Sequence, residues 1–323
     1  MKALITGISG FVGTHLTEYL LRETDCEVAG TVYGPMDSIA QWQDQLHLYP
    51  AELSRLETVS SILSDAQPDL IFHLAAQPLP ALSFKDPWFT LETNIRVQLN
   101  VLEAVRQLHL PARVLVVGSS EEYGAICPKD LPLTEDTPLR PISPYGVSKV
   151  AQDLLGLQYF LSYGIYTVRV RPFNHIGPGQ RPGFVVPDLA QQVAEAEAGR
   201  REPVIHVGNV NVSRDFSDVR DVVRAYYLVL TRGQAGEVYN VGSGQAHSVR
   251  SILEGLLRLS RIPLTYREDV NRVRAVDVPH MRADCSRLRA ATGWEPRISL
   301  QQSLQDILDY WRARVQSEPA AAG

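Results

Sequence analysis

Apolar residues in the first half of this chain follow two alternating patterns. Short runs such as Lys2 to Thr6, Glu27 to Val32 and Val114 to Val117 are largely apolar or β-branched, which is typical of parallel strands buried on both faces. Between such runs, apolar residues recur at helical spacing, as Leu16 and Leu20 do. This alternation predicts an α/β protein in which helices connect the strands of a parallel sheet.

Composition and charge exclude several classes of protein. The chain has 323 residues, a net charge of -5 and no block of like charge, so we expect no nucleic-acid partner. No apolar run approaches the roughly 20 residues that span a bilayer, and the first residues already form a strand and a turn, so we expect neither a membrane partner nor a signal peptide. Cys26, Cys127 and Cys285 are widely separated, which favours a reducing, cytoplasmic location and no metal site.

Three glycines follow the first predicted strand. Gly7, Gly10 and Gly13 form the pattern G-x-x-G-x-x-G directly before an amphipathic helix. Glycines let the backbone pass close to a pyrophosphate, and the N–H groups at a helix start bind its charge. We therefore expect a dinucleotide cofactor here, with Phe11 and Val12 also in contact with it.

The end of the second predicted strand bears on the choice of cofactor. An acid at this place accepts a hydrogen bond from the ribose 2′-hydroxyl of NAD and repels the 2′-phosphate of NADP. Here Thr31, Val32 and Tyr33 supply no acid, and the nearest one, Asp37, lies beyond a Gly-Pro turn. We therefore favour NADP(H), with Thr31 as a contact and NAD(H) as the alternative.

Further cofactor contacts are expected at other strand ends and on one helix. These residues are Glu52, Leu53, Leu74, Ala75, Ala76 and Asn94. Glu52 would contact adenine or would simply be a solvated surface residue, two interpretations that the sequence does not separate. Asn94 either braces the active-site backbone or is an ordinary helix-start residue. Nearby His73 lies in an apolar run, which favours a structural role over catalysis.

The candidate catalytic residues lie between Val114 and Lys149. An apolar run ends in Gly118, so Ser119, Ser120 and Glu121 are expected at the carboxyl end of a strand, where open α/β sheets bind ligands. Tyr145 and Lys149 are four residues apart in a predicted helix and therefore share one face. A neighbouring ammonium group lowers the pKa of a phenol, so we expect Tyr145 to transfer a proton in step with hydride transfer.

These motifs are similar to those of a known family. The glycine pattern, Ser119 and Tyr145-x-x-x-Lys149 resemble the extended short-chain dehydrogenase/reductase family over nearly the whole chain. The resemblance implies that Ser119 hydrogen-bonds the reacting oxygen and that Tyr145 is the acid or base. It also implies that Lys149 lowers the pKa of that tyrosine and holds the nicotinamide ribose.

Several longer phrases resemble the nucleotide-sugar branch of this family. GSSEEYG, SPYGVSK, RPFNHIGPGQ and GNVNVSRDFSDVRD look like enzymes of GDP-mannose deoxygenation. The stronger likeness is to GDP-4-keto-6-deoxy-D-mannose reductases, which form GDP-D-rhamnose, and the weaker one is to GDP-mannose 4,6-dehydratases. The resemblance implies a GDP-hexose substrate. It also implies a homodimer, formed through helices that include Val97 to Val105 and Val150 to Tyr159.

Glu121 keeps the reaction type open. A 4,6-dehydratase needs a second acid or base to remove the C5 proton, whereas a reductase needs only Tyr145 as proton donor. Glu121 stands at the position of the dehydratase glutamate, but Ser119 replaces the usual threonine. We favour reduction of a C4 ketone. The alternatives are a dehydratase with Glu121 as base, a 4-epimerase, and a non-catalytic dinucleotide sensor.

Substrate contacts are expected from strand-end loops and arginines. A guanidinium offers paired donors to phosphate oxygens. Together with Ser119, Ser120 and Glu121, the expected residues are Asn174, Val185, Asn209, Arg214, Arg274 and Asp277. The resulting fold prediction is a Rossmann-like doubly wound parallel sheet with a smaller, discontinuous α/β substrate-binding domain. The dinucleotide-binding domain is expected to comprise residues 1–172 and a return strand near 215–245. The substrate-binding domain is expected to comprise residues 173–214 and 246–315, and residues 316–323 are expected to form a flexible tail.

Overall fold

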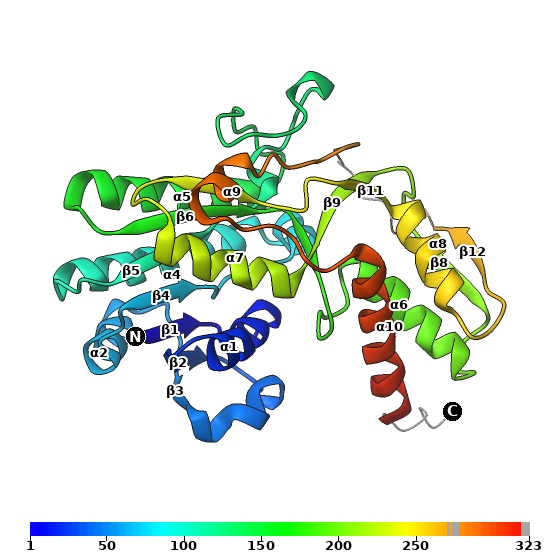
Figure 1. The fold of residues 1–323 in the computed structure, drawn as a ribbon, viewed down its shortest axis with the longest axis horizontal. Helices are drawn as coiled ribbons and strands as arrows, with labels where there is room; N and C mark the ends of the chain where they lie inside the picture. Colours follow the sequence, from blue (N-terminus) through cyan, green and yellow to red (C-terminus); the bar gives the residue numbers. More distant parts are fainter. Residues whose placement is uncertain (270–271, 273–277, 318–323) are drawn as a thin grey trace.

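The largest element of the protein is a seven-stranded parallel sheet. A computed structural model describes residues 1–269, 272 and 278–317. The strands lie in the spatial order β10-β6-β5-β4-β1-β2-β3, and every neighbouring pair is parallel (Figure 1). Their bounds are β1 Lys2–Thr6, β2 Glu27–Val32, β3 Leu46–Pro50, β4 Leu70–His73, β5 Arg113–Val117, β6 Thr167–Pro172 and β10 Val238–Val241.

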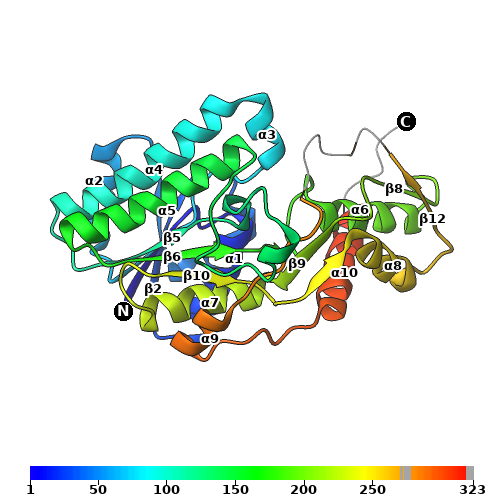
Figure 2. The same cartoon turned by 90° about the horizontal axis from the view of Figure 1, so that it is seen from above.

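Helices cover both faces of this sheet. Apolar side chains of α2, α4 and α5 pack on one face, and those of α1, α7 and α9 pack on the other (Figure 2). Their bounds are α1 Phe11–Glu23, α2 Leu56–Ala66, α4 Pro87–Gln107, α5 Pro144–Tyr163, α7 Val219–Arg232 and α9 Ser286–Thr292. Shorter helices are η1 Asp37–Gln45, α3 Pro80–Lys85, η2 Ser120–Glu122 and η3 Pro128–Asp130. The predicted Rossmann-like, doubly wound fold is confirmed.

The strand order has a topological switch point between β1 and β4. Chain order runs outward from β1 to β2 and β3 on one side, and from β4 to β5 and β6 on the other. The connections leaving β1 and β4 therefore diverge, and open α/β sheets bind ligands at this switch point, outside the carboxyl ends of the strands. The glycine-rich turn follows β1, and Ser119 follows β5. Both motifs thus lie at the same edge of the sheet.

A second group of elements has its own hydrophobic core. Helices α6, α8 and α10 pack around β8 and β9 through buried aliphatic residues and Trp311, to the right of the main sheet in Figure 1. A three-stranded sheet has the order β11-β9-β7, and β12 pairs with β8. The bounds are β7 Asn174–Ile176, α6 Val185–Glu197, β8 Val204–Val207, β9 Ser213–Asp218, β11 Ala246–Ser248, α8 Val249–Leu259, β12 Thr265–Glu268 and α10 Leu300–Ser317.

One expected boundary differs from the structure. The strand of 215–245 that joins the main sheet is β10, whereas β9 pairs with β7 and β11. Helix α10 continues through Gln316 to Ser317, so the expected tail begins too early; residues 318–323 lie outside the described part. The exact division into two domains stays a prediction.

Across residues 1–269, 272 and 278–317, every helix is too short or too polar to span a bilayer. Over the same residues, no three His, Cys, Asp or Glu side chains gather in a way that would hold a metal ion.

Candidate active site

The glycine-rich turn lies between β1 and α1. Gly7 has a φ of 72°, in the left-handed region that favours glycine, and a Cβ there would lie 3.2 Å from the Ala75 backbone. A Cβ on Gly13 would lie 2.5 Å from the carbonyl oxygen of Gly7. No side chain caps α1 at Gly10, so the N–H groups of its first turn, which begins at Phe11, can bind an anion. This cradle fits the pyrophosphate of a dinucleotide.

The end of β2 supports the turn from inside the protein. Thr31 is buried, and its hydroxyl accepts a hydrogen bond from the Gly7 N–H at 3.2 Å. Val12, in the first turn of α1, is half-buried. The residue directly after β2 is Tyr33, which is 80% exposed. An exposed tyrosine thus stands at the strand end where an acidic residue would bind the ribose of NAD. Thr31 thus helps to shape the glycine turn, and a direct contact with cofactor stays a prediction.

The end of β4 runs alongside the same turn. Leu74, Ala75 and Ala76 are half-buried, and the N–H groups of Leu74 and Ala75 donate to the Thr6 hydroxyl at 3.0 and 3.1 Å. Because those two donors occupy its lone pairs, the hydroxyl gives its own proton to Nδ1 of His73, 2.9 Å away. His73 therefore carries its proton on Nε2, and burial lowers its pKa to about 3. A neutral, structural histidine agrees with the prediction.

Glu52 and Leu53 follow β3 and differ in position. Leu53 is buried among the apolar residues between the sheet and α4, and its carbonyl oxygen accepts a hydrogen bond from Asn100 Nδ2 at 2.8 Å. Glu52 is exposed and accepts from the Ser54 hydroxyl at 2.9 Å. An adenine contact and a purely solvated role both remain open for Glu52.

Asn94 joins the β4 end to the helix of the predicted tyrosine. Its Oδ1 accepts from the Gln77 N–H at 2.7 Å, and its Nδ2 donates to the Ser148 hydroxyl at 3.0 Å. Ser148 in turn donates to the Tyr145 carbonyl oxygen at 2.7 Å. The alternative of a helix-start residue is wrong, because α4 begins at Pro87 and Asn94 lies fully buried within it.

Ser119 opens a tight turn at the end of β5. It is the N-cap of η2, and its hydroxyl accepts from the Glu121 N–H at 3.2 Å. Ser119 and Ser120 are buried, with 8% and 5% of their surface exposed, whereas Glu121 is half-buried. This turn lies at the same edge of the sheet as the glycine turn, because β1, β4 and β5 are parallel.

Tyr145 and Lys149 lie in the first two turns of α5, and Ser143 caps this helix by accepting a hydrogen bond from the Gly146 N–H at 3.0 Å. Both side chains are buried. Lys149 Nζ donates to the Val117 carbonyl oxygen at 2.9 Å and lies 5.8 Å from the Tyr145 ring centroid. The ammonium group therefore holds the end of β5 and is not bonded to the phenol.

This geometry corrects the expected pKa of Tyr145. Burial raises the pKa above its ordinary value, the negative charge of Glu121 adds to the rise, and a hydrogen bond with Ser119 opposes it. The expectation of a lowered pKa is wrong for the protein alone, because desolvation of the phenolate outweighs the help of its neighbours. Burial also lowers the pKa of Lys149, to about 8. Tyr145 is therefore a neutral phenol at neutral pH.

A buried ionic network beneath Ser119 was not predicted. Glu122 is fully buried; its Oε1 accepts from the Ser119 N–H at 2.7 Å and its Oε2 from Arg171 Nε at 3.0 Å. The same Nε donates to Asp153 Oδ2 at 2.8 Å, and Asp153 also pairs with Arg169. Burial and the charge of Asp153 raise the pKa of Glu122. This network fixes the turn of Ser119 to α5 and β6.

The sequence contains one signal of this network. Arg169 and Arg171 alternate with Val168 and Val170 in a strand that is otherwise apolar, and buried guanidinium groups need acidic partners. The sequence alone does not show which acids pair with these arginines, because Glu122 is 49 positions from Arg171 in the chain.

Four predicted substrate residues occupy the second group of elements. Asn174 is exposed in β7, Val185 is the first residue of α6, and Asn209 follows β8. Arg214 in β9 is buried, and its Nη1 donates to the carbonyl oxygens of Ser213 and Val278 at 2.9 and 2.5 Å. Arg274 and Asp277 lie outside the described residues.

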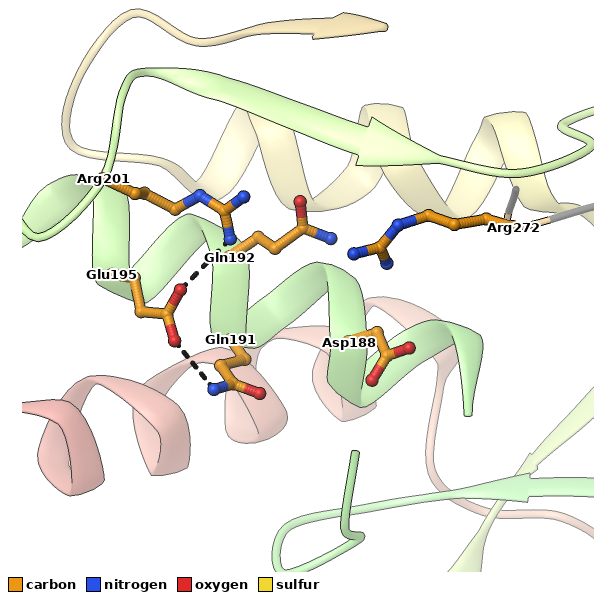
Figure 3. Close-up of a pocket in the computed structure, with 6 residues that line it drawn as sticks. All are labelled: Asp188, Gln191, Gln192, Glu195, Arg201 and Arg272. Carbon is orange, nitrogen blue, oxygen red and sulfur yellow. Dashed lines mark hydrogen bonds and ion pairs between the residues drawn. The ribbon is translucent and has the colours of Figure 1, made fainter. Parts of the chain in front are cut away.

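A polar pocket of about 210 Å³ lies along α6. Figure 3 shows Arg272 reaching toward Asp188 and Gln192, while Glu195 joins Arg201 at the other end. The β8–β9 loop passes close by, since a Cβ on Gly208 would lie 2.5 Å from the Arg272 carbonyl oxygen. None of the predicted catalytic residues lines this pocket.

Comparison with known proteins identifies the family. A model of the family described as GDP-mannose 4,6 dehydratase matches residues 4–307. The chain belongs to this family. The predicted membership of the nucleotide-sugar branch of the extended short-chain dehydrogenases/reductases is thereby confirmed.

Individual relatives refine the comparison. The chain is 36% identical over 318 residues to the GDP-6-deoxy-D-mannose reductase of Pseudomonas aeruginosa, covering 98% of this chain and 99% of the relative. The solved structure of RMD from Pseudomonas aeruginosa complexed with NADPH superposes with a TM-score of 0.84 at 35% identity, covering 97% and 99% of the two chains. The NAD complex of UDP-glucose 4-epimerase from Thermus thermophilus gives 0.86 at 28% identity, with the same coverage.

Proposed function

We propose that the protein reduces the C4 ketone of a GDP-4-keto-6-deoxy-hexose with NADPH. The observation that carries this proposal is the buried, neutral phenol of Tyr145, which is hydrogen-bonded to Ser119 at the end of β5. A phenol kept protonated at neutral pH is the form that donates a proton to an alkoxide. The 36% identity to a reductase over almost the whole chain also supports the proposal.

The cofactor would be held by the glycine turn of Gly7, Gly10 and Gly13, and by Tyr145 and Lys149 at the other end of the crevice. When bound, reduced nicotinamide supplies the hydride. Ser119 would donate a hydrogen bond to the ketone oxygen, and Tyr145 would transfer its proton to that oxygen as charge develops. NADP(H) is favoured because the end of β2 lacks an acid and because the related RMD structure contains NADPH.

The nucleotide would lie over the second group of elements. Asn174 and Arg214 would bind the diphosphate, and the polar pocket along α6 would receive the base, since it adjoins the loop of Asn209. A purine base offers both donors and acceptors, which match a pocket lined by carboxylate, amide and guanidinium groups.

The dehydratase alternative has one specific observation in its favour. The negative charge of Glu121 contributes to the raised pKa of Tyr145, and Glu121 lies in the turn that follows β5, so it is the candidate for a second acid or base. A dehydratase would use this carboxylate to remove the C5 proton of GDP-mannose.

Two assays separate these activities. The purified protein is first given GDP-mannose with catalytic NADP⁺, and then the 4-keto sugar with NADPH. We expect no keto sugar in the first assay and consumption of one NADPH per ketone in the second. A keto sugar from GDP-mannose would establish the dehydratase, and inversion at C4 without net redox change would establish an epimerase. Bound cofactor without turnover would support a sensor.

The low pKa of Lys149 predicts a pH dependence of cofactor binding. Below about pH 8 the amine is charged and donates to the ribose, and it loses that charge as pH rises through about 8. We expect the Kd for NADPH to increase above this pH by up to about tenfold per pH unit. Fluorescence titration of NADPH between pH 7 and 10 measures the effect. The matched Lys149→Met variant should bind NADPH more weakly, and its Kd should not depend on pH over this range. If the variant kept the wild-type pH dependence, a group other than Lys149 would be responsible for it.

We also propose that the protein is a homodimer formed through α4 and α5. Val147, Leu154 and Leu161 lie seven residues apart on α5 and are 45%, 52% and 69% exposed, and Leu99 on α4 is 37% exposed. An apolar stripe of this kind is typical of a surface covered by a partner.

The odd number of free cysteines favours a cytoplasmic, reducing location.

The dimer is tested by Leu154→Glu. A carboxylate in the middle of an apolar helix interface would be buried without a partner, so we expect a monomer where the wild-type protein is a dimer. Analytical ultracentrifugation at micromolar concentration measures the change. Glu57→Ala, at an exposed position of α2, is the control and should leave the dimer intact. A wild-type monomer would contradict the proposal.

A further inference from the structure

Residues 173–180, which we call the strap, leave the main sheet after β6 and cross over the first turns of α1. Two contacts hold them there. His15 Nε2 lies 2.8 Å from the Pro178 carbonyl oxygen, and the ring of His175 stacks on that of Phe11 with centroids 6.1 Å apart and planes 12° from parallel. Phe11 and His15 are four residues apart and therefore share one face of the helix.

Tautomers of the two histidines follow from their partners. A carbonyl oxygen only accepts, so His15 carries its proton on Nε2 and donates it to Pro178. By the same reasoning, His175 carries its proton on Nδ1 and donates to the Phe173 carbonyl oxygen at 3.2 Å. Burial lowers the pKa of both rings. His15 is thus a neutral donor directed at the strap, and its ring lies nearly perpendicular to that of Phe11, with centroids 5.4 Å apart.

The strap is close-packed on this surface. A Cβ on Gly177 would lie 2.5 Å from Val219 Cγ1 and 3.5 Å from Phe11 Cζ, so only glycine allows the present approach. Gln180 Nε2 donates to the His175 carbonyl oxygen at 3.1 Å and closes the segment on itself. The strap is therefore held against α1 by close packing as well as by the two histidine contacts, while β7 within it also pairs with β9.

We propose that His15 is a positioning residue that couples cofactor binding to substrate binding through the strap. Phe11 is the first residue of α1, whose N-terminal turn is the proposed pyrophosphate site, and Asn174 on the strap is the proposed diphosphate contact. A ligand that orders the first turn of α1 stabilises the docked strap, and the docked strap presents Asn174. Such coupling is reciprocal, so each ligand tightens the other by the same factor.

The inference rests on the proposed function, and its test uses NADPH and GDP as probes of the two sites. Calorimetry gives the Kd of GDP for the full chain with and without saturating NADPH. In the wild-type protein we expect NADPH to tighten GDP binding fivefold or more. The coupling factor is the Kd of GDP without NADPH divided by its Kd with saturating NADPH. In His15→Phe, each ligand should still bind on its own, but this factor should fall to within twofold of one.

Two further variants separate coupling from general damage to the fold. His15→Gln retains an N–H at a similar reach and should keep most of the coupling. Gly177→Ala leaves His15 in place but forces the strap away from Val219, and it should reduce the coupling as His15→Phe does. A purely structural role would instead weaken each ligand alone and lower thermal stability without a selective change in the coupling factor.

The outcomes are distinguishable. Wild-type protein that binds GDP equally well with and without NADPH would overturn this inference and leave the proposed function intact. Full coupling in His15→Phe would overturn it as well. Failure of GDP to bind under any condition would overturn the GDP-sugar proposal and this inference together.

Discussion

Replacement of Tyr145 by Phe is expected to lower kcat for ketone reduction by about a hundredfold or more, with KM little changed. The phenol is buried and hydrogen-bonded to Ser119, and burial keeps it protonated. Its hydroxyl is the proton source for the alkoxide in the proposed reaction, whereas the ring that remains in the variant still fills the same space. Steady-state kinetics with NADPH and the 4-keto sugar measure both constants.

A matched control lies at the other end of the same helix. Tyr163 is 53% exposed at the last turn of α5, so Tyr163→Phe makes the same chemical change far from the crevice. It should leave kcat within about twofold of wild type, as surface substitutions usually do. If Tyr145→Phe behaved like this control, another group would have to supply the proton, and Glu121 would be the first to test.

Arg171→Met is expected to destabilise the folded protein by about 3–5 kcal/mol. The guanidinium bonds Glu122 and Asp153 at 3.0 and 2.8 Å, and both carboxyl groups are buried. Its Nη1 also donates to the Glu135 carbonyl oxygen at 3.0 Å. Methionine fills a similar volume but leaves two acids without their shared cation, and that is the costly kind of change in a protein interior.

Urea denaturation followed by circular dichroism measures this loss as a shift of the midpoint at unchanged slope. The control is Arg96→Met, whose ion pair with Glu92 lies on the exposed face of α4 with 54% and 39% of the side chains accessible. Pairs of this kind contribute about 0.3–0.5 kcal/mol. Equal midpoints for the two variants would contradict a supporting role for the buried network.

The proposed reduction also gives the buried network a function beyond stability. Ser119 must hold its hydroxyl near Tyr145 while a substrate enters, and its N–H is fixed by Glu122 at 2.7 Å. Since Glu122 is joined to α5 and β6 through Arg171, the serine and the tyrosine are held by one set of contacts. A rigid arrangement of this kind lowers the cost of reorganisation when charge develops on the reacting oxygen.

Local sequence patterns determined most of the architecture. Alternating apolar runs and helical periodicities predicted the parallel sheet, because strands buried on both faces exclude polar residues. The three glycines and the apolar run before Ser119 predicted two strand-end turns, and these turns follow β1 and β5 at the same edge of the sheet. Asn94 was assigned to the correct region but to the wrong place in its helix, because Pro87 starts α4 a full seven positions earlier.

Tertiary structure alone decided the electrostatics. The sequence places Lys149 next to Tyr145 and suggests a lowered pKa, but the degree of burial depends on every element that surrounds the phenol, and burial prevails. Contacts between Glu122 and Arg171, or between His15 and Pro178, join residues that are 49 and 163 positions apart. Local sequence patterns predict which side chains are buried. Which partners these side chains contact is determined only when segments that are distant in the chain pack together.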